Sequence, residues 1–448
     1  MEPGRSAAGM PSGIANAYAF SVFNALSFQM VLGGPMVLYA KSLGASATVL
    51  GLVTGLMPIM TVAQLPAARF IPRVGYKRFV VGGWTTRVMF IVGMAMVPGA
   101  TWLNEGSRLA LVMALLFAFN LSRGISSCAW LPWITQWVPA TVRGRYLTVD
   151  QAFVNGASAT AFVLAAVLLG PSAGPWRYAL VFGFSAAAGF ASLVFLRRMP
   201  DVPVPPEEGG GKGEVPWGAL AAHPPFRRLL ELNVAWSLAF GGLTTFIVSF
   251  LKSGGGMGER AVLMVMSLSF AGGLASYAVA AGRMERVGSK PVLGLTMALG
   301  MASTLGWMLV AGGVMGGGAW WPCLLAFVVG LCNALFSVAN NRLAMVIVPA
   351  MGRNHFFAIF AVVWQLTLGM SPVLWGILLD AMGERSGAWL GVGWNRYSVF
   401  FGLAAAAFGW AFHLARRLEE PKAGTADALL RELLVQNPQR WLVRLFGR

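Results

Sequence analysis

Long apolar runs are the feature that most constrains the fold of this chain. About twelve runs of roughly 20 residues, bounded by Gly, Pro and basic residues, make up most of the sequence. A helix needs roughly 20 apolar residues to cross a bilayer, and a backbone inside lipid must satisfy its own hydrogen bonds. The runs are continuously apolar rather than alternating, which argues against a membrane β-barrel. The sequence therefore predicts an all-α integral membrane protein.

Composition supports this class and argues against others. Charged residues make up only 11% of the chain, against about 25% in soluble domains. The net charge of +17 suggests a nucleic-acid partner, but the basic residues flank apolar runs, as membrane topology signals do. We therefore expect no nucleic acid. The Cys and His residues show no metal-binding spacing, and no nucleophile motif or phosphate loop is found, so we expect no metal, no cofactor and no enzyme activity.

The runs fall into two sets of six. Residues 1–196 form an N-terminal six-helix half, 197–228 a polar linker rich in Pro and Gly, and 229–414 a C-terminal six-helix half. Residues 415–448 form a tail whose apolar spacing fits either an amphipathic helix on the lipid surface or a short solvated helix. The predicted spans lie near 14–38, 46–68, 79–99, 108–136, 148–169, 176–196, 229–251, 260–281, 291–314, 321–347, 355–379 and 396–414.

The distribution of Lys and Arg predicts the orientation. With the N-terminus in the cytoplasm, 24 of the 33 basic residues fall on the cytoplasmic side and 7 on the outer side. The remaining two, Arg87 and Arg123, lie inside spans. Cytoplasmic segments carry an excess of Lys and Arg. We therefore expect both termini in the cytoplasm and place the chain in a plasma membrane, of the bacterial inner-membrane type.

Two loop motifs repeat at nearly one distance. The segment Arg73–Lys77 follows the second span, and Arg286–Lys290 follows the eighth, 213 residues later. Val138-Pro139-Ala140 follows the fourth span, and Val348-Pro349-Ala350 follows the tenth, 210 residues later. Six spans per half preserve the orientation of each copy. The sequence therefore predicts two pseudo-symmetric six-helix bundles related by an axis along the membrane normal.

The loop after the second span resembles the signature loop of the major facilitator superfamily, G-x-x-x-D-R-x-G-R-R/K. The pattern falls on Ala68, Pro72, Arg73, Gly75, Tyr76 and Lys77, and its second copy on Ala281, Glu285, Arg286, Gly288, Ser289 and Lys290. The first copy lacks the acidic residue, and the second retains it as Glu285. The resemblance implies a transporter in which these loops latch the cytoplasmic side. The alternative is that the basic residues are only topology signals.

The predicted cytoplasmic gate also includes residues just before the fifth and eleventh spans and near the start of the fifth. Its predicted members are Arg73, Gly75, Lys77, Arg143, Asp150, Glu285, Arg286, Gly288, Lys290 and Arg353.

The resemblance also implies that spans 1, 4, 7 and 10 line a central cavity. These spans carry polar residues, which are costly when they face lipid and should face the bundle interior. Some of them will only form hydrogen bonds between helices. The predicted substrate-binding or coupling residues are Asn24, Gln29, Asn120, Arg123, Trp130, Asn155, Asn233, Asn333, Asn340 and Gln365.

Arg123 is the strongest single candidate because a charge near the middle of a span costs about 2.5–3.5 kcal/mol. It fits an anchor for an anionic substrate, part of a coupling network, or a structural pair with a carboxylate. Arg87 lies about 12 Å inside the third span, and we expect it to reach the membrane surface as a structural residue. Trp130 fits either the inner vestibule or core packing.

No Asp or Glu lies near the middle of a predicted span, and Asp150 and Asp380 lie near span ends. Coupling would then use a shallower group such as Asp150, or the protein is a uniporter or an exchanger. We expect a monomeric secondary transporter that moves a small polar or anionic solute by alternating access. A membrane scaffold or assembly factor without transport activity is the alternative.

Overall fold

The computed structural model describes residues 11–204, 223–280, 287–316, 318–347, 353–389 and 392–420. The chain divides into two compact units. Unit 1 comprises Met1–Lys212, Ile247–Ser267 and Pro372–Asp380, and unit 2 comprises Gly213–Phe246, Leu268–Ser371 and Ala381–Arg448. Two segments that follow the predicted linker therefore pack with the first half. Most of that linker and of the predicted tail lies outside the described residues.

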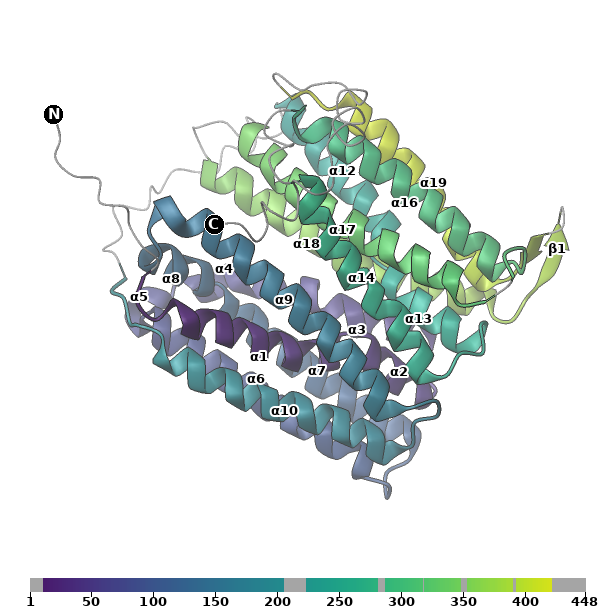
Figure 1. The fold of residues 1–448 in the computed structure, drawn as a ribbon, viewed down its shortest axis with the longest axis horizontal. Coiled ribbons are helices and arrows are strands. Elements are labelled where there is room, and N and C mark those ends of the chain that lie inside the picture. The colour runs from purple at the N-terminus through teal and green to yellow at the C-terminus, as the bar shows by residue number, and fades with distance from the viewer. Residues whose placement is uncertain are drawn as a thin grey trace. The chain divides into compact units, whose positions relative to one another are not determined.

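The helices up to residue 198 belong to unit 1. Here α1 packs against α9 and α10, and α6 packs against α7 and α10 (Figure 1). The elements are α1 (Ile14–Leu32), α2 (Gly34–Ser42), α3 (Ala47–Ile59), η1 (Met60–Ala63), α4 (Gln64–Ala68), α5 (Ile71–Val74), α6 (Tyr76–Met96), η2 (Val97–Gly99), α7 (Glu105–Ser127), α8 (Trp130–Trp137), α9 (Ala140–Leu169) and α10 (Pro175–Arg198).

The remaining elements belong mainly to unit 2, in which α16 packs against α17 and α19, and α12 packs against α19. A short antiparallel hairpin, which the sequence did not predict, precedes the last helix. The elements are α12 (Pro224–Phe240), α13 (Leu243–Ser253), α14 (Glu259–Ala280), α16 (Ser289–Ala311), α17 (Trp320–Ile347), α18 (Arg353–Met382), β1 (Gly387–Trp389), β2 (Val392–Trp394) and α19 (Arg396–Arg417).

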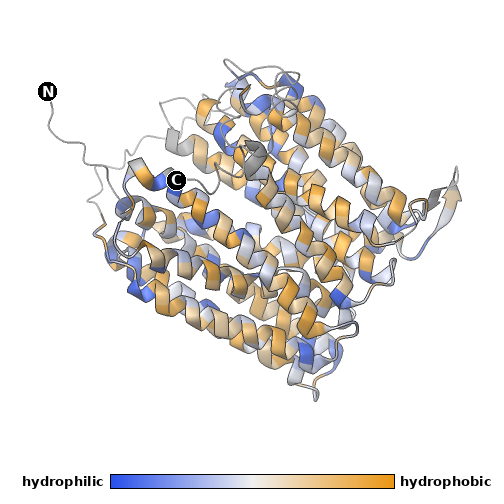
Figure 2. Ribbon diagram, viewed as in Figure 1, coloured by the Kyte–Doolittle hydropathy of each residue, from blue (hydrophilic) through white to orange (hydrophobic). Residues whose placement is uncertain are grey.

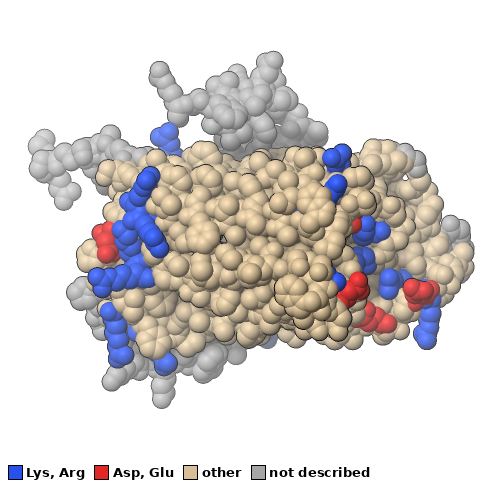
Figure 3. Space-filling view, turned by 90° about the horizontal axis from the view of Figure 1, so that it is seen from below, with Lys and Arg blue, Asp and Glu red and all other residues tan. Residues whose placement is uncertain are grey.

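The predicted membrane architecture is confirmed. Eleven stretches of the described residues are long and apolar enough to cross a membrane, and the eighth predicted run corresponds to α14, a helix of 22 residues. Hydrophobic residues follow the helices, and hydrophilic residues gather toward their ends (Figure 2). On the face drawn in Figure 3, charged side chains lie at the two ends and leave an uncharged band between them. One of these ends carries mainly Lys and Arg.

The first predicted span is interrupted. Gly33 adopts an extended conformation and separates α1 from α2, which has a Pro in its first turn. A Cβ atom at Gly33 would lie 2.9 Å from the ring of Phe162. The break therefore occurs where α1 and α9 approach closely, which only a residue without a side chain permits.

The repeat predicted from the loop motifs is visible in the backbone. Gly75 precedes α6 with a φ of 83°, and Gly288 precedes α16 with a φ of 91°. These glycines occupy equivalent positions of the two loop motifs, 213 residues apart. A positive φ is strained for residues with a Cβ atom, so both copies require glycine at this position.

Within unit 2, α14 and α17 approach closely through two glycines. A Cβ atom at Gly330 would lie 1.7 Å from the carbonyl oxygen of Ser269, and one at Gly272 would lie 2.0 Å from that of Phe327. Small residues allow membrane helices to pack backbone against backbone, where dispersion forces hold them together. This contact leaves no room for a methyl group.

We expect Gly330→Ala to destabilise the protein by about 1–3 kcal/mol, because the added methyl group forces α14 and α17 apart. The midpoint of thermal unfolding in detergent measures the effect. Gly294→Ala on α16 is the matched control, because a Cβ atom there meets nothing within 4 Å and alanine favours the helix. An equal unfolding temperature for the two variants would contradict the close contact.

Candidate functional site

A cavity inside unit 1 brings together helices that are distant in sequence. Its volume is about 220 Å³, and five helices contribute to its wall: α1, α6, α7, α8 and α9. The lining residues are Phe20, Ser21, Asn24, Phe28, Trp84, Arg87, Arg123, Ser127, Trp130, Asp150 and Val154. Three of the predicted substrate-binding residues, Asn24, Arg123 and Trp130, are among them.

Arg87 lies inside this cavity and does not reach the membrane surface as the sequence analysis expected. Its side chain is only 4% exposed. Nη2 donates a hydrogen bond of 3.0 Å to Oδ1 of Asn24, and the guanidinium carbon lies 4.2 Å from the centre of the Trp84 ring. Asn24 Oδ1 also accepts a bond of 3.2 Å from Trp84 Nε1. Arg87 is held inside the bundle because Asn24 and Trp84 solvate it.

Not every donor of Arg87 is used. Its Nε is buried and has no hydrogen-bond partner in the described part of the structure. A buried donor left unpaired costs about 1–3 kcal/mol. The group is thus oriented by α1 and α6 but keeps an unsatisfied donor beside the cavity.

Arg123 projects from α7 into the same cavity and is half-buried. It lies close enough to Arg87 for the two guanidinium groups to repel each other. Among the described residues, neither arginine forms an ion pair. Two cations thus share one small cavity within the membrane-spanning region.

Asp150 supplies a carboxylate to this cavity. It was predicted at the cytoplasmic gate, near the start of its span. In the structure α9 begins at Ala140, so Asp150 lies ten residues inside the helix, and Arg87 lies eleven residues inside α6. Asp150 interacts with Ser21, and its Oδ1 is buried and lacks a hydrogen-bond partner in the described structure. A carboxylate therefore lines the same cavity as the two arginines and forms no ion pair with either among the described residues.

Aromatic rings form one wall of the cavity. The ring centres of Phe20 and Trp130 lie 5.0 Å apart, and those of Trp84 and Trp130 lie 6.2 Å apart. Behind them the buried Trp133 meets Trp130 edge to face. Trp130 thus lines the cavity and packs against the core at once, so the two alternatives considered for it are not exclusive. The wall provides flat apolar surface beside the guanidinium groups.

Other predicted residues of unit 1 lie elsewhere. Gln29 donates a hydrogen bond of 3.1 Å to Ser158, which joins α1 to α9. Asn120 is buried and donates to the carbonyl oxygen of Leu116 within its own helix. Asn155 is half-buried on α9. None of these three lines the cavity.

The predicted residues of unit 2 do not form a comparable cluster. Asn233 and Asn340 exchange hydrogen bonds of 3.1 and 2.7 Å and are fully buried, so their amides hold α12 to α17. Asn333, the repeat partner of Arg123, is exposed, and Gln365 is half-buried.

The predicted gate residues that the structure describes lie at several different places. Arg143 caps the end of α8 by donating to the carbonyl oxygens of Thr135 and Val138. Arg73 is exposed beside Gly75, and Lys77 is half-buried. The backbone amides of Lys290 and Ser289, which follow Gly288, donate to Glu420. Glu285 and Arg286 lie outside the described residues, as does the side chain of Arg353.

Two members of the cavity differ from the prediction: Arg87 was not among the predicted site residues, and Asp150 was predicted as a residue of the cytoplasmic gate and a possible coupling group. The signal for Arg87 was its depth within a span, which applies to it as much as to Arg123. The signal for Asp150 was weaker, because the apolar run begins later than the helix does. No group of three or more metal-ligating side chains is found in the described part of the chain.

The sequence of the chain matches a known protein family. The sequence profile of the Major Facilitator Superfamily matches residues 17–372. No curated protein matches the sequence. A POT family transporter solved in complex with 5-aminolevulinic acid has a TM-score of 0.70 and 11% identity, over 93% of this chain and 97% of that chain.

Two further solved structures share the fold. A mutant of the nucleoside transporter NupG has a TM-score of 0.68 and 11% identity, over 91% of this chain and all of that chain. A bacterial homologue of the iron transporter ferroportin, in an inward-facing state, has a TM-score of 0.65 and 13% identity, over 90% of this chain and 97% of that chain. The resemblance drawn from the loop motifs is thus confirmed, and the chain belongs to the major facilitator superfamily.

Proposed function

We propose that this protein is a secondary transporter that moves a small organic anion, and that the cavity of Arg87 and Arg123 holds its charged group. The observation that carries the proposal is the presence of two arginines and one carboxylate in a single cavity, with no ion pair to either arginine among the described residues. Desolvated cations need a compensating charge, and a carboxylate or phosphate on the solute supplies one.

The geometry favours an anion with a flat or apolar body. A guanidinium group binds carboxylate or phosphate in a bidentate manner and tolerates a stacked ring. The wall formed by Phe20, Trp84 and Trp130 offers such a surface next to the charges. An organic cation would face two like charges in this cavity, so we expect cations to be excluded.

Transport requires that the two six-helix halves open the site alternately to the two sides of the membrane. We propose this mechanism on the basis of family membership and the repeat. We also propose that the end rich in Lys and Arg, with both termini, faces the cytoplasm of a plasma membrane of the bacterial inner-membrane type, because basic residues are retained on that side. Asp150, as the carboxylate of the cavity, is then the group available for coupling.

We expect Arg123→Gln to weaken uptake of the anionic solute by about 10- to 100-fold in apparent affinity, as loss of a charge-assisted hydrogen bond predicts. Arg123→Lys should restore part of the loss because it keeps the charge but not the bidentate geometry. A panel of carboxylates, phosphates and organic cations is first screened by thermal stabilisation of the purified protein. Uptake of the hits into proteoliposomes is then measured.

Arg197→Gln is the control for this experiment, because Arg197 is exposed at the end of α10 and does not line the cavity. Preferential uptake of cations would refute the anion assignment. If no solute stabilises the protein and Arg123→Gln changes nothing, the alternative of a scaffold without transport activity is favoured.

A second variant separates binding from folding. Asn24→Asp places a carboxylate where Asn24 Oδ1 now accepts from Arg87 at 3.0 Å. The resulting ion pair should preserve or raise the unfolding temperature, because the neutral amide is replaced by a charged acceptor. The same pair should lower the affinity for the anion by about tenfold or more, because one positive charge is neutralised.

Asn24→Leu provides the comparison, since it leaves both Arg87 Nη2 and Trp84 Nε1 without their acceptor. It should destabilise the fold by about 1–3 kcal/mol. If Asn24→Asp binds the anion as tightly as the unmodified protein does, Arg87 does not take part in binding.

A further inference from the structure

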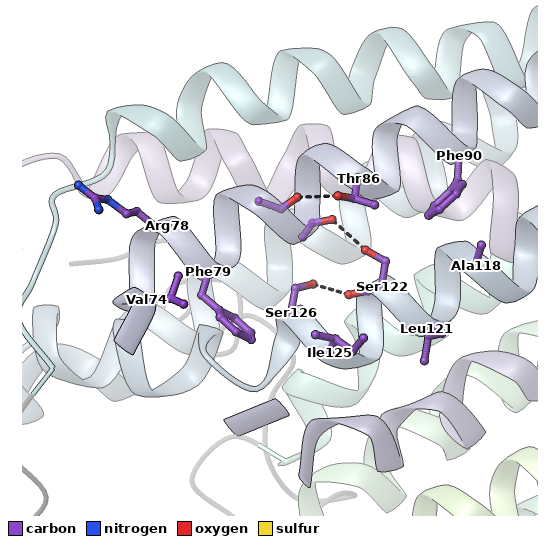
Figure 4. Close-up of a pocket in the computed structure, with 12 residues that line it drawn as sticks. Val74, Arg78, Phe79, Thr86, Phe90, Ala118, Leu121, Ser122, Ile125 and Ser126 are labelled. Atoms are coloured by element: carbon purple, nitrogen blue, oxygen red, sulfur yellow. Dashed lines mark hydrogen bonds between the residues drawn. The ribbon is translucent and has the colours of Figure 1, made fainter. Parts of the chain in front are cut away.

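A second hollow lies on unit 1, between α6 and α7, and shares no residue with the cavity of Arg87 and Arg123. Its volume is about 520 Å³, within the range of about 300–1,000 Å³ that small-molecule sites occupy. Phe79 and Phe90 of α6 and Leu121 and Ile125 of α7 provide apolar surface along its length (Figure 4). We refer to this hollow as the α6–α7 groove.

The surface of this groove is mostly apolar because glycines line part of it and its hydroxyl groups already donate hydrogen bonds to the backbone. A Cβ atom at Gly83 would lie 2.1 Å from Cβ of Ser126, so the two helices are close at the floor, and one at Gly82 would meet nothing within 4 Å. Thr86 donates a bond of 3.0 Å to the Gly82 carbonyl oxygen, and Ser122 one of 3.2 Å to that of Gly83. Because these hydroxyl groups are already hydrogen-bonded, the walls present mainly carbon.

One end of the groove carries a positive charge. Arg78 lies at that end, apart from the apolar wall, and Phe90 lies at the other (Figure 4). The Arg78 side chain is exposed, and it makes no ion pair or hydrogen bond among the described residues. Arg78 and Phe90 are twelve positions apart along α6, which corresponds to a rise of about 18 Å. Half of the hydrocarbon core of a bilayer is about 15 Å thick.

We propose that the α6–α7 groove binds one anionic phospholipid from the leaflet at the basic end of the molecule. The phosphate of the headgroup pairs with Arg78, and one acyl chain lies along the groove toward Phe90. Charge and length together select this ligand. An apolar helix of a partner protein would leave the charge of Arg78 unused, and a free phosphate would leave the apolar length empty.

Native mass spectrometry of the detergent-purified protein, titrated with dioleoyl phosphatidylglycerol or dioleoyl phosphatidylcholine, tests the proposal. We expect one tightly retained phosphatidylglycerol and weaker retention of phosphatidylcholine. Arg78→Gln should lower retention of phosphatidylglycerol about fivefold and remove the preference for it, as the contribution of one basic residue at a membrane surface predicts. Gly82→Leu should remove the tightly retained lipid of either kind, because its side chain fills the groove.

Two control variants accompany these. Arg197→Gln removes an exposed basic residue outside the groove, and Gly183→Leu adds a side chain where nothing lies within 4 Å of a Cβ atom. Both should retain phosphatidylglycerol as the unmodified protein does. All variants are first checked for an unchanged elution volume and unfolding temperature.

Three results would overturn the proposal. The first is equal retention of phosphatidylglycerol by the unmodified protein, Arg78→Gln and Gly82→Leu. The second is equal retention of both lipids by the unmodified protein, which would remove the role of the charge. The third is a dimer in the lipid-free spectrum that Gly82→Leu abolishes, which would make the groove a contact between two copies of the chain.

Discussion

The burial of Arg87 is the interaction on which the candidate site depends. A charge within a membrane-spanning helix is retained only when other groups replace its hydration. Asn24 and Trp84 do this from α1 and from one turn earlier on α6. The bond to Asn24 joins α6 to α1 and orients the guanidinium group beside the cavity. The cost of burying this charge is thus met by contacts that also shape the site.

The second arginine adds a like charge to the cavity, which is why we propose an anionic solute for it. Arg123 adds like charge next to Arg87, and Asp150 shares the cavity without forming an ion pair with either. A bound anion would relieve the repulsion, and loss of the anion would restore it. In the proposed transport mechanism, a bound anion would shift the conformational equilibrium only if it binds one of the two states more tightly than the other.

The membrane spans and the repeat could be predicted from the sequence because each rests on a local pattern, and a local pattern also made Arg123 a candidate site residue. Hydropathy predicts spans, loop motifs predict the repeat, and a charge at depth marks a candidate residue. Which side chain faces which depends on tertiary packing and could not be predicted from such local patterns. Asn233 and Asn340 were predicted among the substrate-binding or coupling residues, with hydrogen bonding between helices as the alternative, and in the structure their amides bind each other across α12 and α17. Asp150 was predicted near the start of its span because the apolar run begins well after α9 does, at Ala140.

The two halves also differ where the sequence repeat suggests likeness. At the start of α16, Glu420 is almost fully buried, accepts hydrogen bonds from the amides of Ser289 and Lys290, and forms an ion pair of 3.0 Å with Arg342. A carboxylate at a helix N-terminus accepts hydrogen bonds from the amides that lack a partner in the helix and interacts favourably with the helix dipole. The first amides of α16 therefore have their acceptor within the chain.

At the start of α6, the matching acidic residue is Asp201, which follows α10 as Glu420 follows α19. Asp201 is exposed and lies near Gly75 and Arg78. Among the described residues it makes no ion pair with Arg78. In unit 2, the carboxylate of Glu420 binds the start of α16 and pairs with Arg342. In unit 1, Arg78 near the start of α6 has no such carboxylate partner among the described residues. An anionic headgroup at Arg78 would supply from the membrane the negative charge that Glu420 supplies from the chain.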